Sequence, residues 1–587
     1  MNVYGIDLGT TNTCISRFAS GLPEIIRIND SDTVPSIVAW DGQRLLVGLA
    51  AKNYSFVSPE NAIRSIKRKM GQLDFRVQLG SREFSPIDVS TEILRFVSDE
   101  AAKVVGEAIK TVVITVPAWF GDEQRRATLA AGKAAGLEVL RIINEPTAAA
   151  LSYQLTQDPS VEQQMEKWLV YDLGGGTFDV SILIVKGDYK EVLATAGNTF
   201  LGGDDFDRLL AQRMVNEIRS RFNIDPDEDP VALAQLRHLA EEAKIALSTE
   251  PEHRITYKLS VLGKQVVLDL NITREEFSEL IEDLVESSIA KVHQALDDAK
   301  LDAQELTRLI LVGGSSRIPL VQERLKDEFG LSPELYIDPD LSVALGAGIQ
   351  AALASGKSCK QIVVDVCPHT LGMAVLGDHD EMFEMRSNIP LSFAPLIQRN
   401  SRLPAKMTRT FCKMHPEQGQ VEIVVFQGES SRTTDNQLIG RFICDLNPTA
   451  QLEFFVSFSY DSNGIIQIGV TQIQGQRPLK QYSMDTNKSE HWNSEPLPMG
   501  QGSDFLDIEM SESAAGANAS EKVSNFLIEQ VELQLQKASE KDRHRMKGQL
   551  QDYRSALLAE DNDTLDTLEN ELYEWLENSR EQEDSHG

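Results

Sequence analysis

The sequence predicts a two-lobed α/β region, followed by an antiparallel β-sandwich and a short α-helical C-terminal segment. Up to about residue 355, short apolar runs alternate with amphipathic helical stretches, a pattern typical of layered α/β structure. Between about 366 and 482 the hydrophobic period changes to two, which is typical of half-buried strands. A strand–Asp–Leu–Gly–turn–Thr pattern occurs at 5–11 and again at 171–179, and two similar α/β halves would explain this repeat.

The individual elements follow in chain order. The apolar runs Val112–Val116 and Leu309–Val312 predict buried strands. Small polar residues then give way to Ile362-Val363-Val364-Asp365, which predicts a linker. Further on, Asn463-Gly464 separates two alternating apolar runs and predicts a hairpin, because both residues accept positive φ. We expect an α/β domain at 1–355, a linker at 356–365, a β-sandwich domain at 366–482, a connector at 483–520 and a helical lid-like segment at 521–580.

The composition argues against several classes of function. Lys and Arg number 57 and Asp and Glu number 89 among 587 residues, so the formal net charge is −32. A chain this acidic repels phosphate backbones, and we expect no binding to nucleic acid or to a membrane. No apolar run approaches the roughly 18 residues of a membrane span, and the first residues lack a signal-peptide pattern. The five cysteines form no C-x-x-C pair, so we expect a reducing, cytoplasmic environment.

Each copy of the repeat ends a strand in an aspartate and then turns through glycine to a residue with a hydroxyl group. Glycine lets backbone N–H groups approach phosphate oxygens closely, and a Thr hydroxyl adds another donor. Asp7 and Asp172 would meet phosphate through Mg²⁺ or its waters. A single Asp-Leu-Gly is usually an ordinary hairpin, but two matched copies would hold a triphosphate from both sides.

A third glycine turn, at 311–319, follows a predicted strand and opens a helix, which suits a nucleotide base or ribose. The sequence contains no G-x-x-x-x-G-K-[ST], which excludes the Walker P-loop class, and no G-x-G-x-x-G that opens a helix. Two further helices are predicted after Asn144 and Ser342, and Pro146 suits a helix start. Their small residues allow a close crossing, which would act as a hinge between the halves.

Together these residues resemble the DnaK-type heat-shock chaperones, the seventy-kilodalton class. The motifs keep the family's order over residues 3 to about 475 and are highly specific in combination. The resemblance lies in Gly5–Thr11, Val116–Phe120, Ile142–Ala150, Asp172–Asp179, Leu201–Gly203 and Gly313–Pro319, then in Asp365–Pro368, Leu371-Gly372, Arg399-Asn400, Thr410-Phe411 and Phe426–Glu429. Cys367-Pro368 and Met414–Gln418 are similar to the HscC-like branch.

The resemblance implies an actin-like ATPase with nucleotide in the cleft between two lobes. It implies an ATP-dependent chaperone that binds extended apolar segments of unfolded or partner proteins, with its affinity switched by ATP binding and hydrolysis. The implied cofactors are ATP or ADP and Mg²⁺, with K⁺ as a further candidate. The implied partners are unfolded polypeptide, a J-domain co-chaperone and a nucleotide-exchange factor, and we expect a monomer.

The resemblance also assigns residues to roles. The catalytic set is Lys67, beside the attacking water, with Asp7, Glu145, Asp172 and Thr177; Asp7 and Asp172 hold the waters of Mg²⁺. The nucleotide-binding set is Gly9, Thr10, Thr11, Asn12, Gly174, Gly175, Gly176, Thr177, Gly202, Gly203, Glu241, Lys244, Ser248, Gly313, Gly314, Ser315, Arg317 and Asp340. The peptide-binding set is Leu376, Met414 and Val421, and the interdomain coupling set is Pro117, Arg125, Arg141, Asn144 and Asp365.

Simpler interpretations stand beside these assignments. Lys67 lies among other cations at 64–69 on a predicted helical stretch and is by itself no more than a solvated charge. Glu241 and Lys244 fit a solvated helix face, and apolar strand residues such as Val421 are more often core than pocket. Beyond 482 the sequence departs from the housekeeping pattern, with a short tail and an irregular connector.

Two other functions stay open from the sequence alone. One is a specialised regulatory binding protein that uses ATP as a latch for a single partner. The other is a small-molecule kinase on the same ATPase fold, which would leave residues 366–587 without a role.

Overall fold

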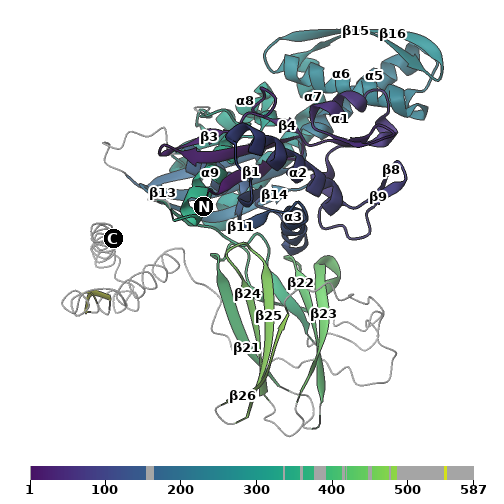
Figure 1. The fold of residues 1–587 in the computed structure, drawn as a ribbon. Coiled ribbons are helices and arrows are strands. Elements are labelled where there is room, and N and C mark those ends of the chain that lie inside the picture. Colours follow the sequence, from purple (N-terminus) through teal and green to yellow (C-terminus); the bar gives the residue numbers. More distant parts are fainter. Residues whose placement is uncertain are drawn as a thin grey trace. The chain divides into compact units, whose positions relative to one another are not determined.

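The fold was analysed in a computed structural model, with the chain coloured along its length in Figure 1. The structure describes residues 2–153, 164–334, 337–356, 361–375, 392–412, 417, 419–446, 453–474, 477–484, 546 and 548–550. Contacts group Met1–Ile508 as one compact unit. The predicted domain boundaries at 355, 365 and 482 stay predictions. None of the described helices is both long enough and apolar enough to cross a membrane.

The α/β region contains two sheets of the same plan, as the internal repeat predicts. In spatial order, the first is β11 (Glu138–Asn144), β10 (Thr111–Val116), β1 (Tyr4–Leu8), β2 (Asn12–Ala19) and β3 (Leu22–Ile25), with β4 (Val34–Pro35) also on β2. The second is β17 (Arg308–Val312), β12 (Glu166–Leu173), β13 (Phe178–Lys186), β14 (Tyr189–Asn198) and β18 (Ile362–Val364). In both, a parallel neighbour and an antiparallel hairpin flank the strand that ends in the Asp-Leu pair.

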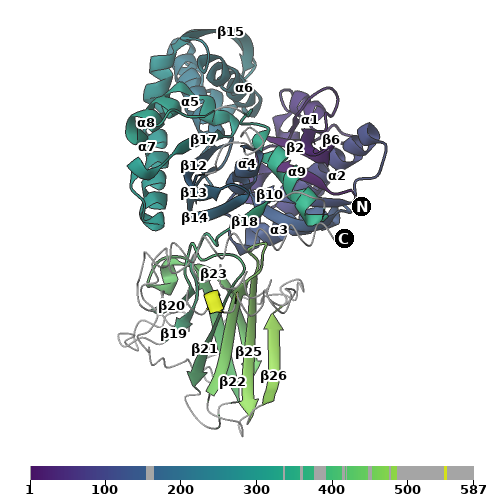
Figure 2. The same ribbon diagram turned by 90° about the vertical axis from the view of Figure 1, so that its left-hand side faces the viewer.

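Helices cover these sheets, and smaller ribbons extend from them (Figures 1 and 2). The helices are α1 (Leu49–Tyr54), α2 (Pro86–Val105), α3 (Asp122–Ala134), α4 (Glu145–Tyr153), α5 (Gly203–Phe222), α6 (Pro230–Leu247), α7 (Arg274–Ala299), α8 (Pro319–Phe329) and α9 (Ser342–Ala354). The small ribbons are β5 (Val38–Trp40) with β6 (Leu45–Val47) and β7 (Ala62–Ile63), β8 (Val77–Leu79) with β9 (Arg82–Phe84), and β15 (Glu252–Val261) with β16 (Lys264–Thr273).

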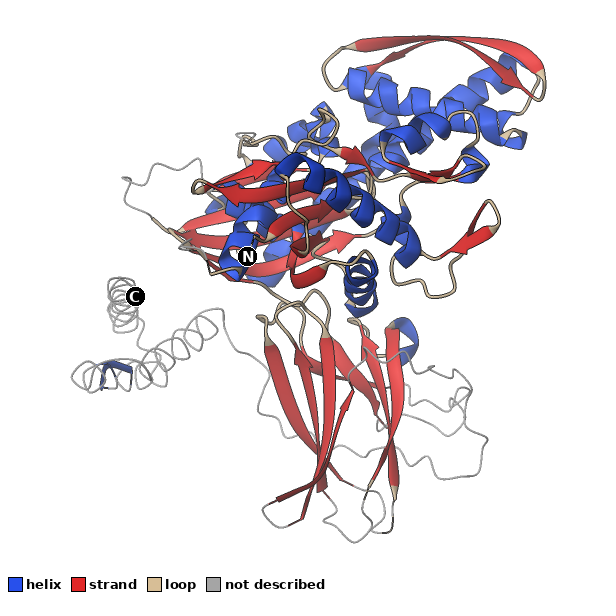
Figure 3. Cartoon of the chain, in the orientation of Figure 1, coloured by secondary structure: helices blue, strands red, loops and turns tan. Residues whose placement is uncertain are grey.

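The described residues of the β module form strands, with one short helical turn at Thr433–Asp435 (Figure 3). One sheet has the order β20 (Ser392–Ile397), β19 (Leu371–Val375), β22 (Gln420–Gln427) and β23 (Gln437–Asp445). The other has the order β21 (Ala405–Cys412), β24 (Glu453–Tyr460), β25 (Ile466–Gln474) and β26 (Arg477–Met484). The apolar positions of both sheets share one core, so the period-two pattern and the hairpin at Asn463-Gly464 are confirmed.

The predicted close crossing of two small-residue helices is confirmed in α4 and α9. A Cβ added to Gly346 would lie 1.7 Å from the carbonyl oxygen of Ala148. On the neighbouring face, a Cβ on Gly5 would lie 2.3 Å from the backbone of Ala347. Pro146 lies in the first turn of α4, as predicted. The backbone of α9 therefore approaches those of α4 and β1 without intervening side chains.

Three segments need separate mention. Lys67 lies on a four-residue 3₁₀ turn, Ile66–Lys69, so the expected helical stretch at 64–69 is shorter and tighter than predicted, and Arg64 precedes it. The apolar end of the predicted linker forms strand β18, parallel to Tyr189–Glu191 of β14. The connector at 483–520 and the helical segment at 521–580 lie almost entirely outside the described residues.

The helix crossing gives a stability prediction. Gly346→Ala should lower the free energy of unfolding by about 3 kcal/mol, because its methyl group would overlap a carbonyl oxygen that belongs to the backbone of another helix. Gly419→Ala is the matched control, since a Cβ there meets nothing within 4 Å. Urea unfolding of both variants would measure the difference, and equal midpoints would contradict the close approach of α4 and α9.

Candidate nucleotide-binding site

The glycine turns of the sequence converge on one place. A Cβ on Gly175 would lie 1.8 Å from the Thr11 hydroxyl, and one on Gly176 would lie 2.4 Å from the Thr10 methyl group. The turns of the two matched hairpins therefore touch each other. Two further turns join them, since a Cβ on Gly202 or on Gly313 would lie 2.5 Å from the backbone of the second hairpin.

The converging turns leave backbone and hydroxyl groups free to meet a ligand. The Thr11 Oγ1 atom is buried and has no hydrogen-bond partner among the described residues. Gly175 and Gly202 contribute to the start of α5, because the amide of Asp204 donates to the Gly175 carbonyl at 2.7 Å. Such a concentration of backbone dipoles and hydroxyl groups suits an anion with several oxygens.

Four carboxyl groups that act on one another lie next to these turns: Glu145, Asp172 and Asp179 are buried, and Asp7 is partly buried. Asp7 and Asp172 occupy equivalent positions, each second from the end of its strand. The Thr115 hydroxyl donates to Asp7 at 2.7 Å, and the backbone N–H of Trp119 donates to Asp179 at 2.8 Å.

One buried cation faces this group. Lys67 is 4% exposed, and its ammonium donates to the Glu145 carboxylate. The interpretation of Lys67 as a solvated surface charge is therefore wrong. Burial raises the pKa of Glu145 to about 8 and that of Asp179 to about 7, although Lys67 acts against both shifts. Burial also raises the pKa values of Asp7 and Asp172, and the neighbouring carboxylates raise that of Asp172 further.

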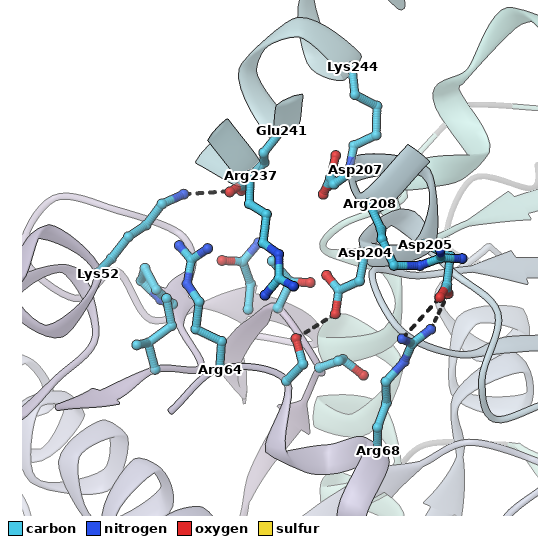
Figure 4. A pocket seen from close by; sticks show the side chains of 16 residues that line it. Lys52, Arg64, Arg68, Asp204, Asp205, Asp207, Arg208, Arg237, Glu241 and Lys244 are labelled. Carbon is cyan, nitrogen blue, oxygen red and sulfur yellow. Dashed lines mark hydrogen bonds and ion pairs between the residues drawn. The ribbon is translucent and has the colours of Figure 1, made fainter. Parts of the chain in front are cut away.

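A cavity of about 350 Å³ opens beside the glycine turns (Figure 4). Of the predicted nucleotide-binding residues, Thr10, Thr11, Asn12, Glu241 and Lys244 line it. Glu241 accepts from Lys52 at 3.2 Å. Burial alone would raise the pKa of Glu241, but Lys52 and Arg64 outweigh it and lower the pKa. Glu241 is thus held as a carboxylate at the wall of the cavity instead of on a solvated helix face.

The remaining predicted residues lie around the turns. Lys244 donates to the Gly203 carbonyl at 3.3 Å and to Asp207 at 2.8 Å, and Ser315 donates to the Gly174 carbonyl at 3.0 Å. The Ser248 hydroxyl donates back to its own helix, and Ser248 does not line the cavity. Arg317 pairs with Asp338 and Asp340 at 2.5 and 3.4 Å, also outside the cavity lining.

The sequence-based assignment missed several polar residues of the cavity. Arg68 donates to the Gly176 carbonyl at 2.7 Å and pairs with Asp205, while Ser65 donates to Asp204. The two aspartates directly follow Gly202-Gly203, so their position in the sequence was a usable signal. Lining residues not assigned from the sequence are Pro35, Ile37, Lys52, Arg64, Ser65, Arg68, Asp204, Asp205, Asp207, Arg208 and Arg237.

The predicted coupling residues form a second buried cluster. The Arg125 guanidinium is fully enclosed and donates to the Asn144 side chain at 2.7 Å and to the Asn463 carbonyl of the β module at 3.2 Å. Asp365 accepts from the Thr147 hydroxyl at 3.1 Å, and its charge acts on Arg125 and Arg141. Pro117 precedes this cluster in the loop after β10, where its carbonyl accepts from Phe120.

The peptide-binding set is only partly visible. Leu376 and Met414 lie outside the described residues. Val421 is 1% exposed and packs in the core of the β-sandwich. Its role in peptide binding stays a prediction. Cys14, Cys367 and Cys412 are free thiols, and Cys359 lies outside the described residues.

The raised carboxyl pKa values give a prediction on stability. Asp179 has a folded pKa of about 7, above its ordinary value of 3.8, so the folded state holds the proton more tightly. Its contribution to stability is therefore lost as pH rises toward 7. Asp179→Asn keeps an acceptor for Trp119 and cannot ionise. As the pH is raised from 5 to 8, its Tm should therefore increase by about 2 to 4 °C relative to that of the wild type.

This comparison is made by calorimetry on the nucleotide-free chain in a chelating buffer. Asp74→Asn, at an exposed position, serves as the control. Parallel curves of Tm against pH for wild type and Asp179→Asn would contradict the burial of an ionisable Asp179.

Comparison with known proteins identifies the family. The sequence matches the Hsp70 protein family over residues 3–586. It is 43% identical over 486 residues to the chaperone protein DnaK of Thermotoga petrophila and to that of Thermotoga neapolitana, covering 80% of this chain and 78% of each relative. The corresponding protein of Thermosipho melanesiensis is 42% identical over 485 residues. Since the match includes the β module, which a small-molecule kinase would not use, the chain belongs to the Hsp70 family of ATP-dependent chaperones.

Proposed function

We propose that this Hsp70 chaperone hydrolyses ATP where its glycine turns converge and passes the result to the β module through the Arg125 cluster. The observation that carries the proposal is the contact between the two matched hairpins above the buried carboxyl groups. Thr10, Thr11 and the turn Gly174–Thr177 would wrap the phosphates. Glu241 and Lys244 would contact the adenosine from the opposite wall of the cavity.

The buried charges fit a divalent cation. The Lys67 ammonium acts on all four carboxyl groups and the Arg125 guanidinium also acts on Asp179, yet the pKa values stay raised, which marks the cost of ionising the carboxyl groups without further positive charge. The described residues contain no group of three or more His, Cys, Asp or Glu placed to bind a metal directly. Asp7 and Asp172 would therefore hold Mg²⁺ through its waters, and Mg²⁺ would neutralise charge on the phosphates. K⁺ stays a further candidate.

Lys67 is placed to act on chemistry more than on binding. Its ammonium is fixed by Glu145 and lies below the turns. Phosphoryl transfer asks the protein mainly for positioning and charge stabilisation. We assign Lys67 to orienting the attacking water, with Glu145 and Thr177 as positioning residues.

In the β module, an extended apolar peptide would gain main-chain hydrogen bonds and side-chain pockets. Leu376, Met414 and Val421 are the residues assigned to it. Unfolded polypeptide, a J-domain co-chaperone and an exchange factor are the proposed partners. A monomeric state, a cytoplasmic location and a resemblance to the HscC-like branch stay predictions. The second candidate function is that of a regulatory protein that binds one partner.

Lys67 separates binding from hydrolysis. Lys67→Ala should keep ATP affinity within about tenfold and slow single-turnover hydrolysis by roughly 10²-fold, the scale of losing one preorganised electrostatic contact. Lys69→Ala is the matched control from the same short turn, since Lys69 lies over the Phe75 ring at 5.3 Å and away from Glu145. Equal, mild losses in both variants would mean that Lys67 takes no part in hydrolysis.

The linker strand gives a prediction on coupling. Residues Ile362–Val364 pair with β14 through their backbone, and we expect this pairing when ATP is bound and its release with ADP. Proteolytic cleavage near Val363 should then be slower in ATP than in ADP. Cleavage at the same rate with both nucleotides would remove the linker from the coupling.

A further inference from the structure

His369 lies at the start of the β module and contacts one backbone carbonyl of the ATPase region. It follows the linker strand, just before β19, and is partly buried. Its Nε2 atom lies 3.0 Å from the carbonyl oxygen of Trp119, in the loop between β10 and α3. The imidazole also meets the indole edge to face, with ring centroids 4.4 Å apart at 74°.

The β module holds His369 from the other side. The Tyr460 hydroxyl donates to the His369 carbonyl at 3.3 Å, and Gln427 donates to that hydroxyl at 2.8 Å. Tyr460 and Gln427 are both buried. The backbone of His369 is therefore held by side chains of the β-sandwich, while its ring contacts Trp119.

Trp119 in turn contacts the phosphate site. Its backbone N–H donates to Asp179, which lies two residues beyond Thr177 of the second glycine turn. The backbone N–H of Trp119 thus contacts the ATPase site, and its backbone carbonyl contacts the β module.

We propose that His369 is a protonation-sensitive clasp: the neutral ring, with its proton on Nε2, holds the β module on Trp119, and a second ring proton favours release. The argument rests on the surroundings of the ring. No described residue accepts a hydrogen bond from Nδ1, so docking offers the imidazolium no new acceptor. Docking also brings the ring within range of the Arg125 guanidinium of the ATPase region, whereas Arg399 acts on the ring from within the β module.

The other charged groups around the ring are few. Glu429 favours the charged ring, and Arg125 and Arg399 oppose it. Burial lowers the pKa of His369 from 6.5 to about 4, against the opposing effects of the Trp119 carbonyl and Glu429. Since the docked state lowers the pKa of a base, docking is fully favoured above pH 6.5 and weakens as pH falls toward 4. Between pH 7.5 and pH 5.5, these two pKa values correspond to a fall of about tenfold in the equilibrium constant for docking.

Carboxyl groups at the same contact act in the opposite direction. Burial raises the pKa values of Asp122, Asp298 and Asp365, so acid favours their docked forms. The net pH dependence of docking therefore does not isolate His369. Comparing the wild type with a variant in which only His369 cannot be protonated isolates the contribution of His369.

The inference rests on the proposed function, because docking is taken to follow ATP. The experiment uses the full chain in ATP, and papain cleavage near Val363 reports undocking. His369→Gln keeps an N–H donor for Trp119 and cannot be protonated. At each pH, the wild-type rate is divided by the variant rate, which cancels the effects of pH on the protease and on the carboxyl groups. This ratio should rise about tenfold from pH 7.5 to pH 5.5.

A constant ratio would overturn the clasp while leaving the chaperone function intact. His293→Gln, at a histidine paired with Glu328 on α7, is the control and should follow the wild type. A second measurement does not depend on cleavage: the ¹³C NMR titration of His369 in ATP, assigned by its loss in His369→Gln. A pKa near 6.5 would overturn the proposal, and a pKa below about 5 would support it. If ATP fails to slow papain cleavage near Val363 at pH 7.5 in both the wild type and His369→Gln, the proposed nucleotide-controlled docking is rejected instead.

Discussion

The structure of the ATPase region depends on close backbone approach at positions that have no side chain. Gly175 and Gly176 rest against Thr11 and Thr10, so the two matched hairpins meet at their turns. The same constraint holds where Gly346 of α9 meets the backbone of α4. A Cβ at any of these positions would separate the two halves, because interiors close-packed in this way have little room to adjust. The site therefore exists only because the halves touch.

That contact concentrates negative charge where it is least stable. Each hairpin brings an aspartate, Asp7 or Asp172, to the equivalent position of its strand, and Glu145 and Asp179 add two more carboxyl groups. Lys67 is the buried ammonium that faces them. Ionised groups without water or counter-charge are costly, so the raised pKa values of these carboxyl groups fit the proposed binding of a cation and a polyphosphate.

The contacts between the ATPase region and the β module involve the loop after β10, next to this charged group. Trp119 contacts Asp179 through its N–H and His369 through its carbonyl. Arg125 binds Asn144 and the carbonyl of Asn463, and β18 adds a strand to the sheet that carries Asp172. A few hydrogen bonds thus connect the segment that follows the second glycine turn to the β module, which is the route assumed in the proposed function. Such bonds are worth most when they are shielded from water.

The sequence by itself determined the architecture and the core of the site. Its repeat predicted the paired hairpins, its change of period predicted the β-sandwich, and the motif order identified the family before the fold was seen. These features are local, since each needs only a strand, a glycine and a turn in succession. The sequence could not determine that Lys67 is buried, because it lies in a cation-rich segment in which nothing local distinguishes it from its neighbours.

The tertiary structure decided this by burying Lys67 on Glu145, 78 positions away in the chain. It likewise decided that Lys52, Arg68 and Asp204 line the cavity, that Ser248 does not, and that His369 rests on Trp119. Burial and counter-charge come from residues distant in sequence, and no local pattern encodes which of them will meet.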